Sequence, residues 1–217
     1  MHTLIISGGT IDTDFALDLL KKEKYDHIIG VDGALKFCKE QNIVPTRIVG
    51  DFDTLDPEIL TWYQTHTQIE IRQFNPVKDA TDTQIAIELA MELGSRKITL
   101  IGGTGTRLDH VLGNIQTLYL PFVKGIDCRI VDAHNRIRLV SGELHLKMTE
   151  QWGKYVSLIP FTTDVEGVDL IGFKYPLEKF NFTVLGTGSR GVSNEIAEEE
   201  AVIRIEKGIM ILVESKD

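Results

Sequence analysis

The chain has 217 residues, of which 42% are apolar and 25% are charged, a composition that is typical of folded globular proteins and excludes collagen-like, low-complexity and disordered chains. Acidic residues outnumber basic ones by 32 to 23, and no cluster of Lys and Arg resembles those that bind nucleic acid or lipid surfaces. We therefore expect neither nucleic acid nor a membrane as a partner. A phosphate-bearing ligand remains compatible with the charge, because a divalent cation can bridge carboxylates and a polyphosphate.

The amino terminus and the cysteines indicate the cellular compartment. Residues 1–7 contain no basic segment followed by an apolar run of signal length, and no window approaches the ~18 apolar residues of a membrane span. Cys38 and Cys128 lie far apart and lack the spacing of a metal-binding pair. We expect a cytoplasmic protein whose cysteines are reduced.

The first 133 residues alternate short β-branched runs with helical periodicity, which is typical of repeated β-α units and a mostly parallel sheet. The pattern predicts strands at residues 3–7, 27–31, 47–49, 69–74, 97–101 and 128–131. Apolar stripes at three- and four-residue intervals predict helices between them, at Phe15/Leu19, Leu35/Cys38 and Ile85/Leu89/Leu93. The last of these helices has capping-box spacing at Thr81 and Gln84, and Gly94 predicts its end.

From about residue 136 the apolar period changes to two. Strands are predicted at residues 136–140, 143–148, 154–160, 165–173, 180–185, 201–206 and 209–214. The dipeptides Ser141-Gly142, Glu166-Gly167 and Lys207-Gly208 predict hairpin turns. The sequence thus indicates an α/β domain over residues 1–135 and a smaller antiparallel β-sandwich or barrel over residues 136–217.

Ligands of open parallel sheets bind beyond the carboxyl ends of the strands, so the segments after each predicted strand are the candidate site. Polar residues follow the predicted strands at residues 7–10, 32–33, 50–53, 78–82 and 102–110. We expect these segments to meet at one edge of the sheet.

Asp51 and Asp53 are the most informative acidic pair. Alternate residues of an extended chain point the same way, so both carboxylates can reach one cation, and Asp82 in the first turn of the next predicted helix can converge on them. Each has a plainer interpretation. Asp51 and Asp53 can simply form a turn after a strand, and Asp79 and Asp82 can simply stabilise a helix terminus.

Residues Gly102–Gly105 followed by Arg107 suit a close approach of the backbone to phosphate, with a guanidinium that can bind two of its oxygens. The segment is neither a Walker A loop nor a dinucleotide fingerprint. The glycines can also serve only to turn the chain, and Arg107 can pair structurally with Asp109. His110 can act as a general base, orient a neighbour or cap a helix.

Taken in order, these segments resemble the thiamine pyrophosphokinase family over nearly the whole chain. The motifs are Asp32-Gly33-Ala34, Gly50-Asp51-Phe52-Asp53-Thr54, Lys78-Asp79-Ala80-Thr81-Asp82, residues 102–110 and Gly191-Val192-Ser193-Asn194-Glu195. The family often has glycine where Ala34 stands and serine where Thr54 stands. The resemblance implies an α/β domain followed by a β-sandwich, a homodimer, and Mg²⁺-dependent transfer of pyrophosphate from ATP to the hydroxyl of thiamine, with release of AMP.

The resemblance also implies roles for individual residues. Those that hold Mg²⁺ and carry catalysis are Asp51, Asp53 and Asp82, with Asp79 adjacent, and either Asp82 or Asp79 would accept the hydroxyl proton. Those that bind ATP and its phosphates are Asp32, Gly105, Arg107, Asp109 and His110. Those that bind thiamine are Ser193, Asn194 and Asp82. Two plainer readings stay open: Ser193-Asn194 can be a turn before a strand, and Trp152 can be a core residue instead of a stacking partner of the thiazolium.

Two other functions fit parts of the sequence. One is a nucleotide-sensing module of the same fold that performs no transfer, although a pure binder would need fewer carboxylates. The other is an ATP hydrolase or ordinary kinase, which would release ADP instead of AMP.

Overall fold

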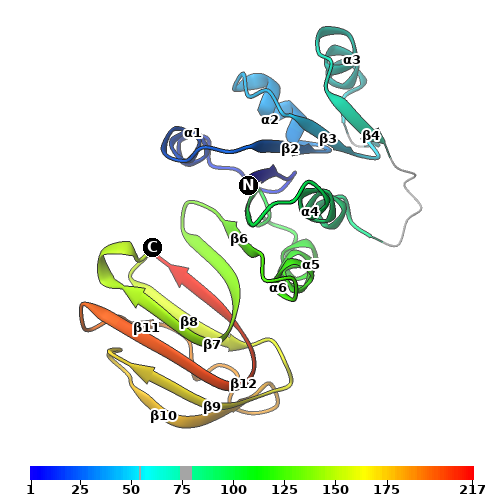
Figure 1. The fold of residues 1–217 in the computed structure, drawn as a ribbon. Coiled ribbons are helices and arrows are strands. Elements are labelled where there is room, and N and C mark those ends of the chain that lie inside the picture. Colours follow the sequence, from blue (N-terminus) through cyan, green and yellow to red (C-terminus); the bar gives the residue numbers. More distant parts are fainter. Residues whose placement is uncertain (54, 74–79) are drawn as a thin grey trace. The chain divides into compact units, whose positions relative to one another are not determined.

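The computed structural model describes residues 1–53, 55–73 and 80–217, and these form two compact units, Met1–Ala133 and His134–Asp217 (Figure 1). The boundary expected from the sequence, after residue 135, lies close to this division. Among the described residues, no helix has the length and apolar character that crossing a membrane requires.

The first unit is a parallel sheet with connecting helices. Its strands are β1 (His2–Ile6), β2 (His27–Val31), β3 (Arg47–Gly50), β4 (Glu70–Gln73), β5 (Lys97–Ile101) and β6 (Asp127–Val131). Its helices are α1 (Thr13–Lys22), α2 (Ala34–Glu40), α3 (Pro57–His66), α4 (Asp82–Glu92), α5 (Leu108–Thr117) and α6 (Tyr119–Phe122). The strand pattern confirms the parallel sheet expected from the sequence, whereas α3, α5 and α6 had no predicted counterpart. Phe74, at the end of a predicted strand, lies outside the described residues.

The order of the strands places a topological switch at β1. Strands run β6-β5-β1-β2-β3-β4, and every neighbouring pair is parallel. The chain therefore builds outward from β1 in one direction and then returns to its other side with β5. Leu4, Ile5 and Ile6 are all fully buried, as expected for a strand covered on both faces. In open sheets of this kind the crevice at the switch point is the usual ligand site.

Helix α4 begins and ends where the sequence predicted. The Thr81 hydroxyl accepts the N–H of Gln84 at 3.2 Å, which satisfies one unpaired donor of the first turn. At the other end Gly94 has φ 81° and the N–H of Ser95 donates to the carbonyl of Ala90 at 3.1 Å. This closing turn is a Schellman motif, which requires a residue that tolerates positive φ.

The buried face of α4 differs from the predicted stripe. Leu89 is buried as expected, but Ile85 and Leu93 are only half-buried, whereas the buried set also contains Thr83, Ala86, Ile87 and Ala90. These four positions recur at three- and four-residue intervals and so form one helical face. The predicted stripe lies to one side of this face, which combines small residues with the large Ile87.

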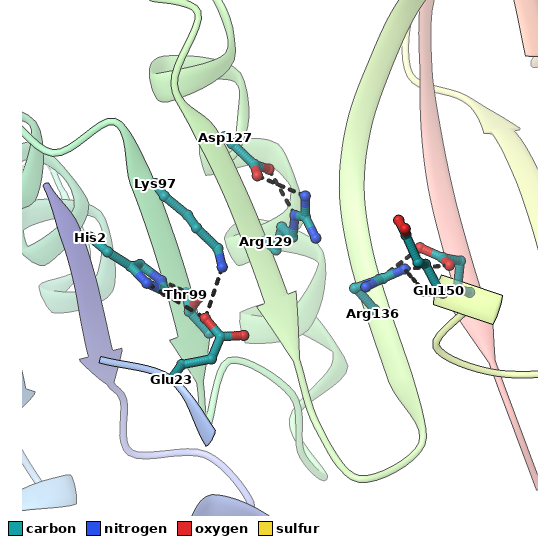
Figure 2. A network of polar contacts seen from close by, with 9 residues as sticks. His2, Glu23, Lys97, Thr99, Asp127, Arg129, Arg136 and Glu150 are labelled. Carbon is teal, nitrogen blue, oxygen red and sulfur yellow. Dashed lines mark hydrogen bonds and ion pairs between the residues drawn. The ribbon is translucent and has the colours of Figure 1, made fainter. Parts of the chain in front are cut away.

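At the amino-terminal end of the strands, polar side chains of β1 and β5 meet (Figure 2). His2 lies 2.9 Å from the Thr99 hydroxyl through Nε2 and 3.5 Å from a Glu23 oxygen through Nδ1, and Lys97 binds the same Glu23 oxygen at 2.8 Å. Burial and the neighbouring Lys97 lower the pKa of His2, and they outweigh the opposite effect of Glu23. The lowered pKa favours the neutral form of His2, which lies at the edge of the sheet opposite the switch-point crevice.

The second unit is antiparallel. Its strands are β7 (Asn135–Lys147), β8 (Tyr155–Pro160), β9 (Asp164–Ile171), β10 (Leu177–Thr183), β11 (Asn194–Glu195) and β12 (Glu200–Ser215), with a short 3₁₀ turn at Met148–Glu150. Strand β12 pairs with β7 along most of its length, with β9 through its first half and with β8 through its second half. The two halves enclose one apolar core, in which Val165, Val168 and Met210 are fully buried. This confirms the expected sandwich.

The three predicted hairpin turns are wrong. Gly142, Gly167 and Gly208 lie inside β7, β9 and β12, with φ of 68°, 64° and 102°. The pairing of β12 with β7 shifts register between Ile205 and Met210, as at a β-bulge. A positive-φ glycine serves a two-residue turn and a bulge equally well, so the sequence signal is the same for both. The bends let β12 leave β9 and continue beside β8.

Candidate functional site

The carboxyl-terminal edge of the sheet in the first unit surrounds a pocket of about 710 Å³. Segments that follow β1, β2, β3 and β5, together with the first turn of α4 and one side of α5, line it. The lining includes the predicted site residues Asp32, Asp51, Asp53, Asp82, Gly105, Arg107 and His110. Described residues from each of the polar segments that the sequence analysis singled out thus lie around one cavity.

Two loops form the wall of the pocket at the switch point. Beyond the ends of β1 and β5, the N–H of Gly9 donates to the carbonyl of Gly102 at 2.9 Å, and the N–H of Thr10 donates to that of Thr104 at 2.8 Å. A Cβ atom on Gly9 would overlap the carbonyl oxygens of Gly102 and Thr104. The glycines therefore allow a close approach between two backbones, so their first role here is structural.

Buried polar side chains fix these loops. Asn114 is buried in α5, and its amide donates to the carbonyl of Gly103 at 2.8 Å. The hydroxyls of Ser7 and Thr83 lie 2.7 Å apart and join the end of β1 to the start of α4. The sequence analysis missed Asn114, which is the only described residue of α5 that is buried. Only its burial in the structure identifies it, because a single asparagine in a helical segment is not by itself a signal.

Three carboxylates lie together on the other side of the pocket. Asp32, Asp51 and Asp53 each offer an oxygen, and these oxygens lie within 4.8 Å of one another. Hard oxygen ligands in such a cluster suit Mg²⁺, whose ligands at about 2.0–2.1 Å can lie up to roughly 4.2 Å apart across the ion. A small adjustment closes the cluster around a cation. The donor set therefore fits a divalent metal.

Asp32 reaches this cluster from the end of β2. Its N–H donates to the carbonyl of Val49 at 2.9 Å, and its backbone is left-handed, with φ 43°. Aspartate is one of the few residues that tolerate this conformation. The sequence analysis placed Asp32 with the nucleotide; the geometry places it in the acidic cluster, and the available signal was an Asp-Gly pair directly after a strand.

Phe52 anchors the loop that carries the two other carboxylates. It is 8% exposed, packs among Leu35, Ile59 and Tyr63, and has φ 62°, which is rare for a bulky side chain. A strained backbone of this kind persists only where its surroundings hold it. With Phe52 turned into the core, the residues on either side of it contribute to the pocket. The N–H of Asp53 also donates to Asp51 Oδ1 at 3.2 Å. Asp51 therefore stabilises the turn after β3 as well as belonging to the group of close carboxylates.

Asp82 lines the pocket as the first residue of α4, but the group of three close carboxylates contains Asp32 in its place. The positive end of the helix dipole favours an anion at this position. Asp79 lies outside the described residues. The place of both in the chemistry stays a prediction.

Arg107 lines the pocket and is paired with Asp109. Its Nη2 lies 2.6 Å from Asp109 Oδ2 and its Nε lies 3.3 Å from Oδ1, a two-point contact between exposed side chains. This hydrogen bonding lowers the pKa of Asp109 and raises that of Arg107. Asp109 is not among the residues that line the pocket, whereas His110 is. Asp109 is thus placed to orient Arg107, which leaves the outer part of the guanidinium available to a ligand.

Two of the three predicted thiamine residues, Ser193 and Asn194, lie in the second unit. Ser193 is exposed, and Asn194 is buried beside it at the start of β11. Trp152, the possible stacking residue, is half-buried, with the guanidinium carbon of Arg136 at 5.5 Å and Lys216 Nζ at 5.9 Å from its ring centre. Cations thus already lie against the indole, which favours a structural role.

Comparisons with known proteins agree along the chain. Residues 16–130 match the family model described as the thiamin pyrophosphokinase catalytic domain, and residues 142–210 match that of its vitamin B1 binding domain. A thiamine pyrophosphokinase of Bacillus subtilis is 34% identical over an alignment of 195 residues, and the match covers 87% of each chain. The crystal structure of the Bacillus subtilis thiamine pyrophosphokinase covers 100% of both chains, with 30% identity and a TM-score of 0.86. That from Geobacillus thermodenitrificans also has a TM-score of 0.86 and 30% identity, over 100% of this chain and 98% of its own.

Proposed function

The chain belongs to the thiamin pyrophosphokinase family, and we propose that it transfers a pyrophosphate group from ATP to the hydroxyl of thiamine, giving thiamine diphosphate and AMP. The observation that carries the proposal is the acidic cluster of Asp32, Asp51 and Asp53 beside a glycine loop at the switch point of the sheet. A nucleotide sensor without activity is not favoured, because such a module would not need this many carboxylates around one pocket. The described elements support residues 1–135 as the nucleotide- and metal-binding domain and residues 136–217 as the thiamine-binding domain.

Mg²⁺ is the metal that we assign to the reaction. The carboxylates of Asp32, Asp51 and Asp53 would hold it, with Asp82 as a further acidic group on the same pocket. When bound, the ion would neutralise charge on the phosphate oxygens of ATP.

Arg107 supplies the positive charge for the ATP phosphates. Asp109 holds one side of its guanidinium, so the fork is oriented before a phosphate arrives. His110 and Gly105 line the same part of the pocket, and the amino terminus of α5 starts there. The backbone N–H groups of this first turn and the helix dipole favour a bound anion.

The acceptor hydroxyl must lose a proton as it attacks phosphorus. Asp82 is the first residue of α4 and lines the pocket. We assign to it the acceptance of this proton, with Asp79 as the alternative acceptor. Asp82 would also contact thiamine. Ser193 and Asn194 are the residues of the second unit that we assign to thiamine, by the resemblance of Gly191–Glu195 to the family motif.

We further propose a cytoplasmic homodimer. The family resemblance supports the dimer, and Leu108 and Leu112, one turn apart on α5, are 70% and 63% exposed, which suits a subunit contact. Sedimentation at assay concentration tests this assembly. An active species that stays monomeric would contradict it.

Product analysis tests the reaction. The purified protein, incubated with ATP, thiamine and Mg²⁺ and then separated by chromatography, should form thiamine diphosphate and AMP in equal amounts. Excess chelator should abolish turnover. ADP as the stoichiometric product would indicate an ordinary kinase, and ATP binding without any product would indicate the sensor.

Substitutions then test the site. Asp51→Asn, Asp53→Asn and Asp82→Asn should each lower turnover by roughly 10²-fold, the cost of removing one preorganised electrostatic group. Asp18→Asn, an exposed helix residue paired with Lys22, makes the same charge change away from the pocket and should leave turnover unchanged. A near-normal rate across a magnesium titration would remove that aspartate from the site.

A further inference from the structure

Ser193 has an unusual backbone for its residue type. Its φ is 59°, in the left-handed region that non-glycine residues seldom occupy, and its side chain is exposed. Such a conformation persists only where neighbouring groups determine it. The neighbours that do so lie in the same unit of the chain.

Ser157 holds Ser193 from one side. It is 7% exposed, between the buried Val156 and Leu158 of β8, and its hydroxyl accepts the backbone N–H of Ser193 at 3.0 Å. The N–H of Leu158 donates in turn to the carbonyl of Gly191 at 2.8 Å. The loop before β11 is thus fastened to β8 on both sides of Val192.

Asn194 holds the same loop from the other side. Its side chain is 6% exposed and pairs with the backbone of Tyr175 in both directions: Oδ1 accepts the N–H at 3.0 Å, and Nδ2 donates to the carbonyl at 2.8 Å. Oδ1 also accepts the N–H of Glu195 at 2.9 Å. The pairing continues through the N–H of Lys174, which donates to the carbonyl of Glu195 at 2.9 Å. Because the side-chain amide of Asn194 makes these hydrogen bonds within the protein, it has little hydrogen-bonding capacity remaining for a ligand.

From these contacts we propose that Ser157 and Asn194 are positioning residues, which lock the left-handed backbone at Ser193 so that its hydroxyl meets thiamine in a fixed orientation. The inference rests on the proposed function for the identity of the ligand. It changes the role expected of Asn194, from a thiamine contact to a support of the contact, and it assigns a role to Ser157, which no sequence motif contains. Preorganisation of this kind acts on substrate binding, because the hydroxyl need not be ordered when thiamine arrives.

Kinetics of single variants give the first test. Ser157→Ala removes one hydrogen bond to Ser193 and should raise the KM for thiamine about fivefold, the effect of roughly one net hydrogen bond. The KM for ATP should change little, and Ser157→Thr, which keeps an acceptor oxygen, should restore the wild-type value. Thr162→Ala is the matched control, because Thr162 also accepts a backbone N–H, that of Ile209 at 3.1 Å, at another turn of the unit. It should leave the KM for thiamine unchanged.

A double-substitution cycle separates positioning from general stability. Ser193→Gly removes the hydroxyl without opposing the left-handed backbone, and by itself it should raise the KM for thiamine. In that background Ser157→Ala should add no further increase, because no hydroxyl remains to be positioned. Additive effects would overturn the proposal, as would an unchanged KM in Ser157→Ala or in Ser193→Gly. An unchanged KM in Ser193→Gly would contradict only this proposal, and the proposed transfer of pyrophosphate to thiamine would be unaffected.

Amide hydrogen exchange tests the geometry without any turnover. The N–H of Ser193 should exchange slowly in the wild-type protein and faster in Ser157→Ala, with the amides of β12 unaffected. A wild-type Ser193 amide that exchanges at the rate of an open loop would overturn the proposal whatever the enzyme does. Slow exchange in a protein that fails to convert thiamine would support the locked backbone and count against the proposed reaction alone.

Discussion

Replacing Asp32 by Asn tests the acidic cluster directly. Asn tolerates a left-handed backbone as Asp does, so the change keeps the φ of 43° and the size of the side chain while it removes one charge from the three. The wild-type cluster should bind Mg²⁺, and binding should stabilise the fold by RT ln(1 + [Mg²⁺]/Kd), or about 2.7 kcal/mol at a concentration of 100 times Kd. The loss of one of three close carboxylates should weaken binding by roughly 10²-fold, in line with the cost of disturbing a metal site.

At the same magnesium concentration the variant should then gain only about 0.4 kcal/mol, which follows from the same expression when the concentration equals Kd. The difference of about 2.3 kcal/mol corresponds to roughly 5–9 °C in melting temperature for a chain of this length. Thermal unfolding with and without Mg²⁺ measures it, and Asp18→Asn serves as the charge-matched control. If Asp32→Asn keeps the full magnesium-induced shift of the wild-type protein, then Asp32 is no part of a metal site and the cluster is an accident of packing.

Substitutions at three further residues give tests, at Arg107 and Phe52 beside the pocket and at His2 on the opposite edge of the sheet. Arg107→Ala should raise the KM for ATP by roughly tenfold or more, as expected for the loss of a charge-assisted hydrogen bond. Arg107→Lys should restore only part of the affinity for ATP, because lysine lacks the planar guanidinium that Asp109 orients. An equal KM for ATP in the wild-type protein and both variants would refute the assignment. Phe52→Ala should lower the free energy of unfolding by about 3 kcal/mol, measured by urea unfolding, and should also weaken magnesium binding in a titration. Phe52→Leu should keep most of the stability and most of the magnesium affinity. Unchanged magnesium binding in Phe52→Ala would show that the ring does not hold the carboxylates in place. Because the pKa of His2 is lowered on folding, the unfolded chain binds more protons than the folded one below about pH 6.5. The free energy of unfolding should therefore decrease as the pH is lowered through this range, and this dependence should be weaker in His2→Gln. Identical pH profiles of the two proteins would show that burial and Lys97 do not lower the pKa of His2.

The sequence by itself determined the class of each half of the chain. The alternation of β-branched runs with helical stripes requires one face of each helix to be buried on a sheet, and Thr81 and Gly94 mark the ends of α4 because caps depend on local backbone chemistry. It also predicted that Asp51 and Asp53 would come near one pocket, because strand ends in a parallel sheet share an edge. The family motifs named the reaction that the comparisons then supported.

Only the tertiary structure decided how the site is assembled. Asp32 joins the acidic cluster because β2 lies between β1 and β3, a neighbour relation that spacing along the chain does not contain. The glycines predicted to turn hairpins bend long strands instead, since positive φ is a local property and the partner of each strand is not. Asn194 is likewise assigned by its position: its amide completes the backbone pairing of Tyr175, a residue that is remote in sequence and adjacent in space. Local chemistry is thus readable from sequence, whereas the side chains that support a site are fixed by which strands and loops the fold brings together.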